Sequence, residues 1–467
     1  MAIEQLRSAV KGLASATAHL SDAELASGAF AWGDYTGVRM ALLGTAQDLD
    51  ALSAALLVQR AKTGNPITHI QHLLGHHRVA YRDLEGLLAG IEPDKLTRAP
   101  AQGEWPVVEA LHHLYEAERS FFISILAGID AQAKHETAVM PPRDQRGALL
   151  PEAGPLPAET DGPAAVLTAY TRLHFLIETK LAGLTHGQLE ARSPFWEPEQ
   201  PSVAFRVGRF TAHLREHRIQ IEKTLLALGH IPHEMALHTR MLYQALGRVE
   251  GALMGAPELA GECESLARAI TERSEQAVEA VADSAGLMAA IRAGNTGEVD
   301  RLLAKNPLLM DATDANQQSA VLVAAYAHQT ALAQKLHKAG AELDIFSAAA
   351  IGYLPEVEEY YAWNPATIDW FAKDGFTPLQ LACYFGQEEV ALWLIAKGAD
   401  IHAVSKNGSA LQAIHAGVAG RNATIVRALL EAGADKQAEQ AGGFTPLMAA
   451  EQNGDKAISA LLRRGDG

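Results

Sequence analysis

The first 285 residues contain long stretches in which apolar side chains recur every three to four positions, separated by loops rich in proline and glycine. This period is typical of amphipathic helices. It predicts helices at residues 3–19, 37–62, 66–91, 105–129, 163–183, 203–229, 234–255 and 259–282. The longest interruption, residues 140–163, is rich in proline and is expected to form a surface loop.

From about residue 285 the pattern becomes a repeat, in which Gly375 and Gly408 occupy matching positions 33 residues apart. Thr-Pro-Leu opens helices at 377–379 and 445–447, where threonine caps the helix and proline fixes its first turn. Gly-Ala-Asp closes units at 398–400 and 433–435, and this glycine suits the left-handed turn that follows a helix. These segments resemble ankyrin repeats, of which about six are expected over 285–467. The resemblance implies an α-solenoid that binds a protein partner.

Composition supports helices packed on helices, because 48% of the residues are hydrophobic and only 6% are aromatic. We therefore predict an all-α protein. The formal charge of −16, from 39 basic and 55 acidic residues, argues against a nucleic-acid partner or an anionic membrane surface. The N-terminus carries charges within its apolar stretch, so neither a signal peptide nor a membrane span is expected and a cytoplasmic location is predicted.

Two cysteines, Cys263 and Cys383, stand far apart in segments predicted to be helical. A disulfide framework or a cysteine-based metal site is therefore not expected. Each is interpreted as a small buried apolar residue.

Two groups of histidines show helical spacing. His213 and His217 stand four residues apart in RFTAHLREHRIQIEKTL (209–225), on one helix face with Ala212, Leu214 and Ile221 nearby. His72 and His76 have the same spacing in ITHIQHLLGHH (67–77), with His69 before them. With 19 histidines in the chain, such a pair is also expected by chance, so spacing alone does not distinguish a metal site from a solvated helix face.

Two motifs give the first pair a context. In GEWPVVEALHHLYEAE (103–118), Trp105 precedes His113 by eight residues, and His217 is followed by Gln220 and Ile221. Both features resemble the DinB-like (DinB/YfiT-type) family, four-helix bundles that hold a divalent metal with three histidines. The resemblance covers about residues 66–230 and implies His113, His213 and His217 as the metal ligands.

The family resemblance also implies a chemistry. Characterised members include metal-dependent S-transferases that use low-molecular-weight thiols, such as bacillithiol or mycothiol, and a related isomerase. Three imidazoles leave coordination positions open, where a bound water or thiol becomes a nucleophile near neutral pH. Zn, Ni and Fe all accept imidazole ligands, so the sequence does not choose among them. Glu116, three residues after His113, is a candidate to orient a ligand or accept a proton.

Several alternatives stay open at this point. His112 competes with His113, and His69, His72 and His76 form a rival group. Glu116 fits a solvated surface position equally well, while Trp105 is interpreted as a packing residue. The bundle could also be structural, which would make the protein a non-catalytic ankyrin adaptor or a ligand sensor.

The expected organisation has four parts. Residues 1–65 form N-terminal helices that flank the bundle, and residues 66–230 form the four-helix bundle. Residues 231–284 add helices that could pair with 1–65, and residues 285–467 form the ankyrin repeats. Substrate is expected to enter beside the 140–163 loop and the 193–202 segment, because binding residues concentrate on loops.

Overall fold

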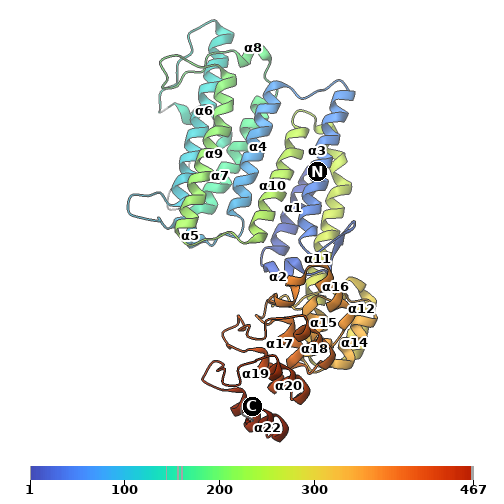
Figure 1. The fold of residues 1–467 in the computed structure, drawn as a ribbon. Coiled ribbons are helices and arrows are strands. Elements are labelled where there is room, and N and C mark those ends of the chain that lie inside the picture. Colours follow the sequence, from blue (N-terminus) through green and yellow to red (C-terminus); the bar gives the residue numbers. More distant parts are fainter. Residues whose placement is uncertain (1, 144, 155–156, 159–160, 464–467) are drawn as a thin grey trace. The chain divides into compact units, whose positions relative to one another are not determined.

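The computed structural model describes residues 2–143, 145–154, 157–158 and 161–463. The chain divides into two compact units, Met1–Asp22 with Arg39–Ala277 and Ala23–Val38 with Val278–Gly467. Both units are helical, which confirms the predicted all-α class (Figure 1).

The helices of the first unit follow the predicted periodicity closely. They are α1 (Ala2–Thr17), α3 (Met40–Lys62), α4 (His69–Leu88), α5 (Pro93–Thr97), α6 (Val107–Lys134), α7 (Gly162–Leu181), α8 (His186–Leu189), α9 (Val203–Ala227), α10 (Glu234–Leu253) and the start of α11 (Cys263–Arg292), with short 3-10 turns η1 (Arg146–Leu149), η2 (Pro151–Ala153) and η4 (Pro257–Glu262). Helix α2 (Asp22–Ala26) begins at the last residue of this unit's first segment.

Several local features were not predicted, among them the short helices α2, α5 and α8. Helix α11 runs on to Arg292, past the predicted helix end at 282 and the expected domain border after 284. No proline interrupts residues 283–292, so the helix continues without a break into the first repeat. A short hairpin also forms, in which β1 (Ala31–Trp32) pairs antiparallel with β2 (Tyr35–Thr36).

Four helices, α4, α6, α7 and α9, form a bundle around one hydrophobic core. Helix α6 packs on α7 and α9, and α4 packs on α9. Local sequence sets two of the starts: Thr68 and Gln71 form a capping box before α4, and the Ser202 hydroxyl accepts from the Phe205 N–H before α9. The largest apolar side chains buried between the four helices include Leu74, Leu84, Leu114, Phe122, Leu173, Ile177, Phe210 and Leu214.

Helix α10 packs along both α4 and α3, and glycines bring α4 and α10 close together. A Cβ atom placed on Gly247 would lie 3.0 Å from the Cα of Val79, and one on Gly86 would lie 2.9 Å from the Cα of Arg240. Gly251 similarly faces Gly75, with only 3.2 Å between its hypothetical Cβ and the Gly75 Cα. The two backbones therefore approach to a distance that no other residue type permits without a shift.

A buried ion pair joins the same two helices. Arg82 donates two hydrogen bonds to Glu250, of 2.7 Å from Nε and 2.6 Å from Nη2. Burial opposes the charged form of Glu250, but Arg78 and Arg82 outweigh it and lower the pKa of this carboxyl to about 2. Glu250 therefore stays ionised in the folded protein and fixes α10 to α4.

The second unit stacks helix pairs in the manner of a repeat protein. The end of α11 pairs with α12 (Thr296–Lys305), and five further pairs follow: α13 (Ala320–Tyr326) with α14 (Thr330–Lys338), α15 (Ile345–Ile351) with α16 (Leu354–Trp363), α17 (Pro378–Tyr384) with α18 (Glu388–Ala396), α19 (Ala413–Ala419) with α20 (Ala423–Glu431), and α21 (Pro446–Gln452) with α22 (Lys456–Arg463). Turns η5 (Pro307–Asp311) and η6 (Pro365–Asp369) follow α12 and α16.

The repeat signatures act as the sequence predicts. Thr377 and Thr445 cap α17 and α21 with proline next to them in the first turn. Gly398 and Gly433 have φ values of 85° and 96°, in the left-handed region that glycine enters without strain.

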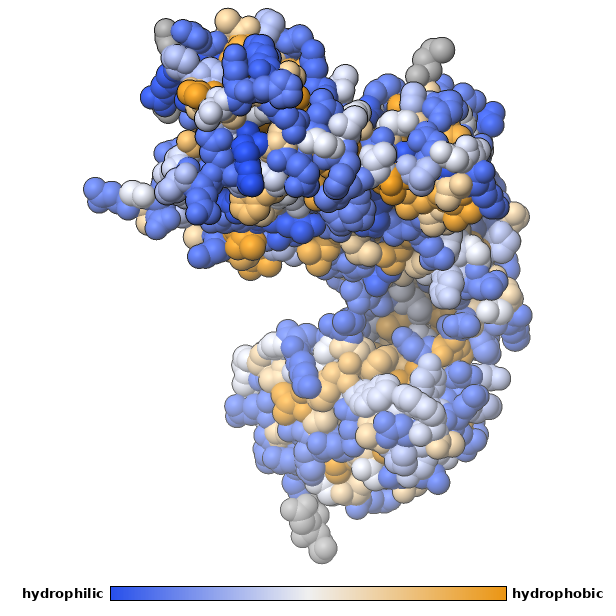
Figure 2. Space-filling model, turned by 90° about the horizontal axis from the view of Figure 1, so that it is seen from above, coloured by the Kyte–Doolittle hydropathy of each residue, from blue (hydrophilic) through white to orange (hydrophobic). Residues whose placement is uncertain are grey.

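The face seen in Figure 2 is mostly hydrophilic, with hydrophobic residues scattered over it. Among the described residues one helix, α3, is long and apolar enough to cross a membrane by length and composition alone. The core helix of a bundle passes the same test, and α3 packs along α10. It also carries Asp48 and Asp50, which pair with Arg273 and Arg248.

The close approach of α4 and α10 predicts opposite effects for two glycine-to-alanine changes. Gly247→Ala should lower the free energy of unfolding of the first unit by about 1–2 kcal/mol, because backbone atoms block the new Cβ. Gly12→Ala, in an open position of α1, should instead raise it by about 0.5–1 kcal/mol through helix propensity. Urea denaturation followed by circular dichroism measures both, and equal effects would contradict the packing argument.

The Arg82–Glu250 pair predicts a loss of stability in acid. The folded-state pKa of Glu250 is lowered from 4.5 to about 2, so its contribution is complete above pH 4.5 and falls as the pH drops toward 2. The loss from this one group is about 1.4 kcal/mol per pH unit in that window. The free energy of unfolding of Glu250→Gln should therefore be lower than that of the wild type at pH 6. The difference between the two proteins should become smaller between pH 4.5 and 3. A constant gap across that range would refute the assigned pKa.

Candidate metal centre

Helices α6 and α9 bring three histidines together. His113 lies in the second turn of α6, and His213 and His217 lie one turn apart on α9. The Nε2 atom of His213 is 3.2 Å from Nε2 of His113 and 3.1 Å from Nε2 of His217. The three rings therefore meet through the same nitrogen, with His213 buried and the other two half-buried.

A neighbouring amide fixes the tautomer of one ring. The Gln220 side-chain oxygen lies 2.7 Å from Nδ1 of His217 and can only accept a hydrogen bond. Nδ1 of His217 therefore carries the proton, and its Nε2 presents a lone pair to the other two rings. A partner of this kind commonly orients a metal-bound histidine.

The surroundings of His113 and His213 favour their neutral forms. Burial, followed by the proximity of His217 and His113, lowers the pKa of His213 to about 3. Burial and the proximity of His217 also lower the pKa of His113. Neutral imidazole is the form that binds metal ions.

The spacing of the three nitrogens fits a divalent metal. Ligands about 2.0–2.1 Å from a common ion, at angles between octahedral and tetrahedral, are separated from one another by about 2.9–3.4 Å. The observed separations of 3.1 and 3.2 Å fall within that range. A single proton can bridge only one pair of these nitrogens, whereas a cation between them satisfies all three lone pairs. The residues present therefore fit a metal ion.

Two aromatic side chains flank the histidines. The Trp105 ring lies 5.3 Å from the His113 ring and stacks on the His217 ring at 6.3 Å with an interplanar angle of 12°. The Phe121 ring packs edge-on against His213 at 5.7 Å. Trp105 is thus a packing residue, as interpreted from the sequence, and its contacts position the rings.

A cavity of about 460 Å³ opens beside His113 and His213. Its lining includes four arginines, Arg119, Arg143, Arg146 and Arg209, and one acidic residue, Glu116. Phe195 and the largely exposed Trp196 complete it. Residues of the loop at 140–163 and of the segment at 193–202 both contribute to this lining.

The remaining sequence candidates lie apart from the three rings. His112 points elsewhere, with Nε2 3.1 Å from the Pro157 carbonyl oxygen. His72 and His76 lie 3.1 Å apart through Nε2 but are exposed. No third ligand joins them among the described residues. The described residues contain two groups that could hold a metal ion: His113, His213 and His217, and a second group that is completely buried.

Sequence reasoning missed that second group, His77, Glu118 and His174, and also the arginines of the loop at 140–163. The three buried residues lie on three different helices, α4, α6 and α7. Their spacing in the chain therefore does not indicate that they form one group. In the sequence, Glu118 and His77 differ from their surroundings only as polar residues within apolar helix faces.

Comparison with known families separates the chain into two recognisable regions. Residues 76–221 match the model of the DinB superfamily, and residues 287–405 match a model of three copies of the ankyrin repeat. The first match contains the three converging histidines, Gln220 and the arginine-lined cavity. The second covers the units that carry the less regular repeats together with the regular one at 374–403.

Proposed function

We propose that this chain, which joins a DinB superfamily domain to ankyrin repeats, is a metal-dependent enzyme acting on an anionic small molecule. His113, His213 and His217 hold the divalent ion, for which Zn, Ni and Fe are candidates. The reaction is a thiol S-transfer or a hydrolysis, and the ankyrin repeats bind a protein partner. The observation that carries this proposal is the convergence of three Nε2 atoms: that of His213 lies 3.2 Å from that of His113 and 3.1 Å from that of His217.

The side chains around the histidines support catalysis in distinct ways. A bound divalent ion would supply Lewis-acid activation of a water or a thiol. Gln220 holds His217 in the tautomer that presents Nε2, and Trp105 and Phe121 cover the rings with apolar surface. Glu116 lies at the cavity and is the carboxylate available there to accept a proton.

The cavity charge indicates the class of substrate. Four arginines and one glutamate line this cavity, in a chain whose net charge is −16. Arg146 donates from Nε to the Pro141 carbonyl oxygen at 2.9 Å, whereas the buried Nε of Arg119 has no hydrogen-bond partner among the described residues. Guanidinium groups bind carboxylates and phosphates through paired hydrogen bonds. A low-molecular-weight thiol or electrophile that carries carboxylates fits this lining.

The ankyrin repeats support a role in recognition. Exposed hydrophobic side chains of the second unit include Tyr384, Phe444 and Met448, which suit contact with a protein. We place the protein in the cytoplasm, where its free cysteines, Cys263 and Cys383, would stay reduced. An adaptor without turnover is the second candidate, and the metal content of the bundle separates the two.

Removing one ligand tests the metal centre. His213→Ala and His217→Ala should each carry one metal equivalent per chain fewer than the wild type, and Gln220→Ala should bind the ion about 10–100-fold more weakly. His112→Ala, next to His113 but directed at Pro157, is the matched control and should keep the wild-type content. Elemental analysis of the purified proteins measures this, and unchanged metal in both α9 variants would remove the enzymatic proposal.

Replacing an arginine tests the substrate class. Arg209→Ala should lower kcat/KM for 2-mercaptosuccinate about tenfold, which corresponds to ~1.4 kcal/mol, and leave the rate with its neutral dimethyl ester nearly unchanged. Arg268→Ala, an exposed arginine on α11 outside this cavity, is the control. An equal loss for the acid and the ester would show that the arginines do not select the charge.

A further inference from the structure

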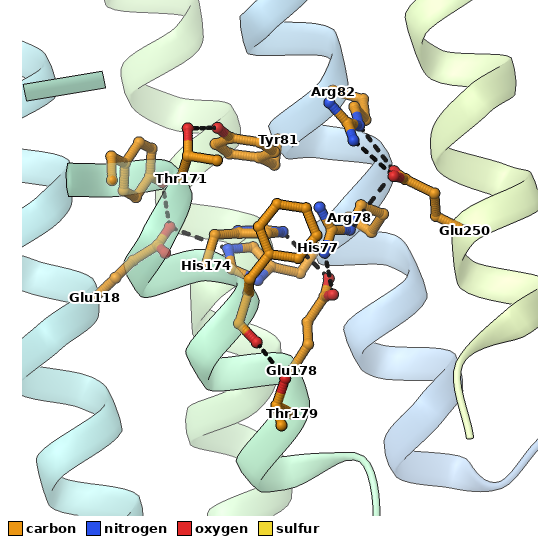
Figure 3. Close-up of polar contacts among 12 residues, drawn as sticks. His77, Arg78, Tyr81, Arg82, Glu118, Thr171, His174, Glu178, Thr179 and Glu250 are labelled. Carbon is orange, nitrogen blue, oxygen red and sulfur yellow. Dashed lines mark hydrogen bonds and ion pairs between the residues drawn. The ribbon is translucent and has the colours of Figure 1, made fainter. Parts of the chain in front are cut away.

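A second cluster of ligand-type side chains lies inside the bundle. His77, Glu118 and His174 come from α4, α6 and α7, and none of the three is exposed. One ligand atom of each lies within 4.8 Å of the others, and Nε2 of His77 is 3.0 Å from an oxygen of Glu118. Figure 3 shows these side chains pointing toward one another from their three helices.

Several polar atoms of this cluster have no hydrogen-bond partner among the described residues. They are both ring nitrogens of His174, Nδ1 of His77 and the second carboxylate oxygen of Glu118. Nε2 of His174 is 3.2 Å from Glu178 but does not form a hydrogen bond with it. Burying such atoms without partners costs about 1–3 kcal/mol each, so this concentration of them needs a physical cause.

Charge balance points to a missing cation. The nearby arginines are engaged elsewhere, Arg78 with Glu178 and Arg82 with Glu250 (Figure 3). Glu118 meets only the Tyr170 hydroxyl and His77. Among the described residues no lysine or arginine pairs with Glu118, and a completely buried carboxylate is strongly destabilised unless a cation joins it.

We propose that His77, Glu118 and His174 bind a second divalent cation, distinct from the one at the three histidines. Two imidazoles and one carboxylate form a donor set for Zn²⁺ or Fe²⁺. The cation neutralises Glu118 and binds one ring nitrogen of His174, while Tyr170 holds the carboxylate in place.

The second site is structural rather than catalytic. His77, Glu118 and His174 are completely buried, and the five main cavities among the described residues are lined by other side chains. The ion therefore ties α4, α6 and α7 together without access for a substrate. It also supports the first site indirectly, because Phe210 stacks on His77 at 5.1 Å and lies one turn before His213 on α9.

The test starts from a full-length chain that lacks the other histidine sites. The variant H113A/H213A/H217A, with H72A and H76A added, leaves the buried cluster untouched. After loading with Zn²⁺ and gel filtration in metal-free buffer, elemental analysis should find about one zinc per chain. Circular dichroism verifies the fold. Adding Glu118→Gln, close in size to glutamate, should reduce zinc to less than a tenth of an equivalent.

Two outcomes would overturn the second site: a folded five-histidine variant without zinc, or zinc that Glu118→Gln does not remove. If the Glu118→Gln chain fails to fold, anomalous diffraction from zinc-loaded crystals of the five-histidine variant decides. A peak among His77, Glu118 and His174 supports the site, and its absence refutes it. If instead the first site does not bind zinc, the wild type and the five-histidine variant would hold equal amounts of zinc. This result is distinguishable from failure of the second site.

Discussion

The packing of α6 against α9 is the contact on which the chemistry of this bundle depends. It brings three imidazole edges together, so that the buried Nε2 of His213 lies against the Nε2 atoms of His113 and His217. Such an arrangement is unfavourable for the rings alone, since neutral nitrogens with lone pairs facing one another repel. It becomes favourable when a cation is shared, and the apolar contacts of Trp105 and Phe121 then strengthen the attraction by excluding water.

Helix α4 plays the complementary part on the other side of the bundle. Its glycines allow α10 to approach closely, and its arginines match buried glutamates on α7 and α10. Within this balanced network Glu118 stands out, because no arginine reaches it among the described residues. Two buried glutamates thus pair with arginines of α4, whereas Glu118 pairs with a histidine, which is why we propose a cation beside it.

The sequence predicted the parts of the fold that local chemistry determines. Apolar periodicity placed the long helices, and Thr377 and Thr445 marked repeat helices because a cap and a proline act within one turn. For the candidate site, the distance from Trp105 selected His113 over His112, and the structure brings His113 to His213 and His217. That selection came from a family pattern, since spacing within one helix cannot show what a facing helix contributes.

The remaining features depend on contacts between distant segments. His77 and His174 are nearly a hundred residues apart, and neither is distinguished from a surface histidine by its neighbours in the chain. The arginine-lined cavity needs the loop at 140–163 to fold back beside α6 and α9. Helix α11 continues past the expected border. A change in sequence pattern indicates where a repeat begins, but it does not indicate where a helix ends.

Anomalous diffraction from crystals of the wild-type chain grown with Zn²⁺ tests the central claim most directly. We expect a peak about 2.0–2.1 Å from Nε2 of each of His113, His213 and His217. The absence of a peak there, with zinc bound only at exposed histidines such as His72 and His76, would contradict the account.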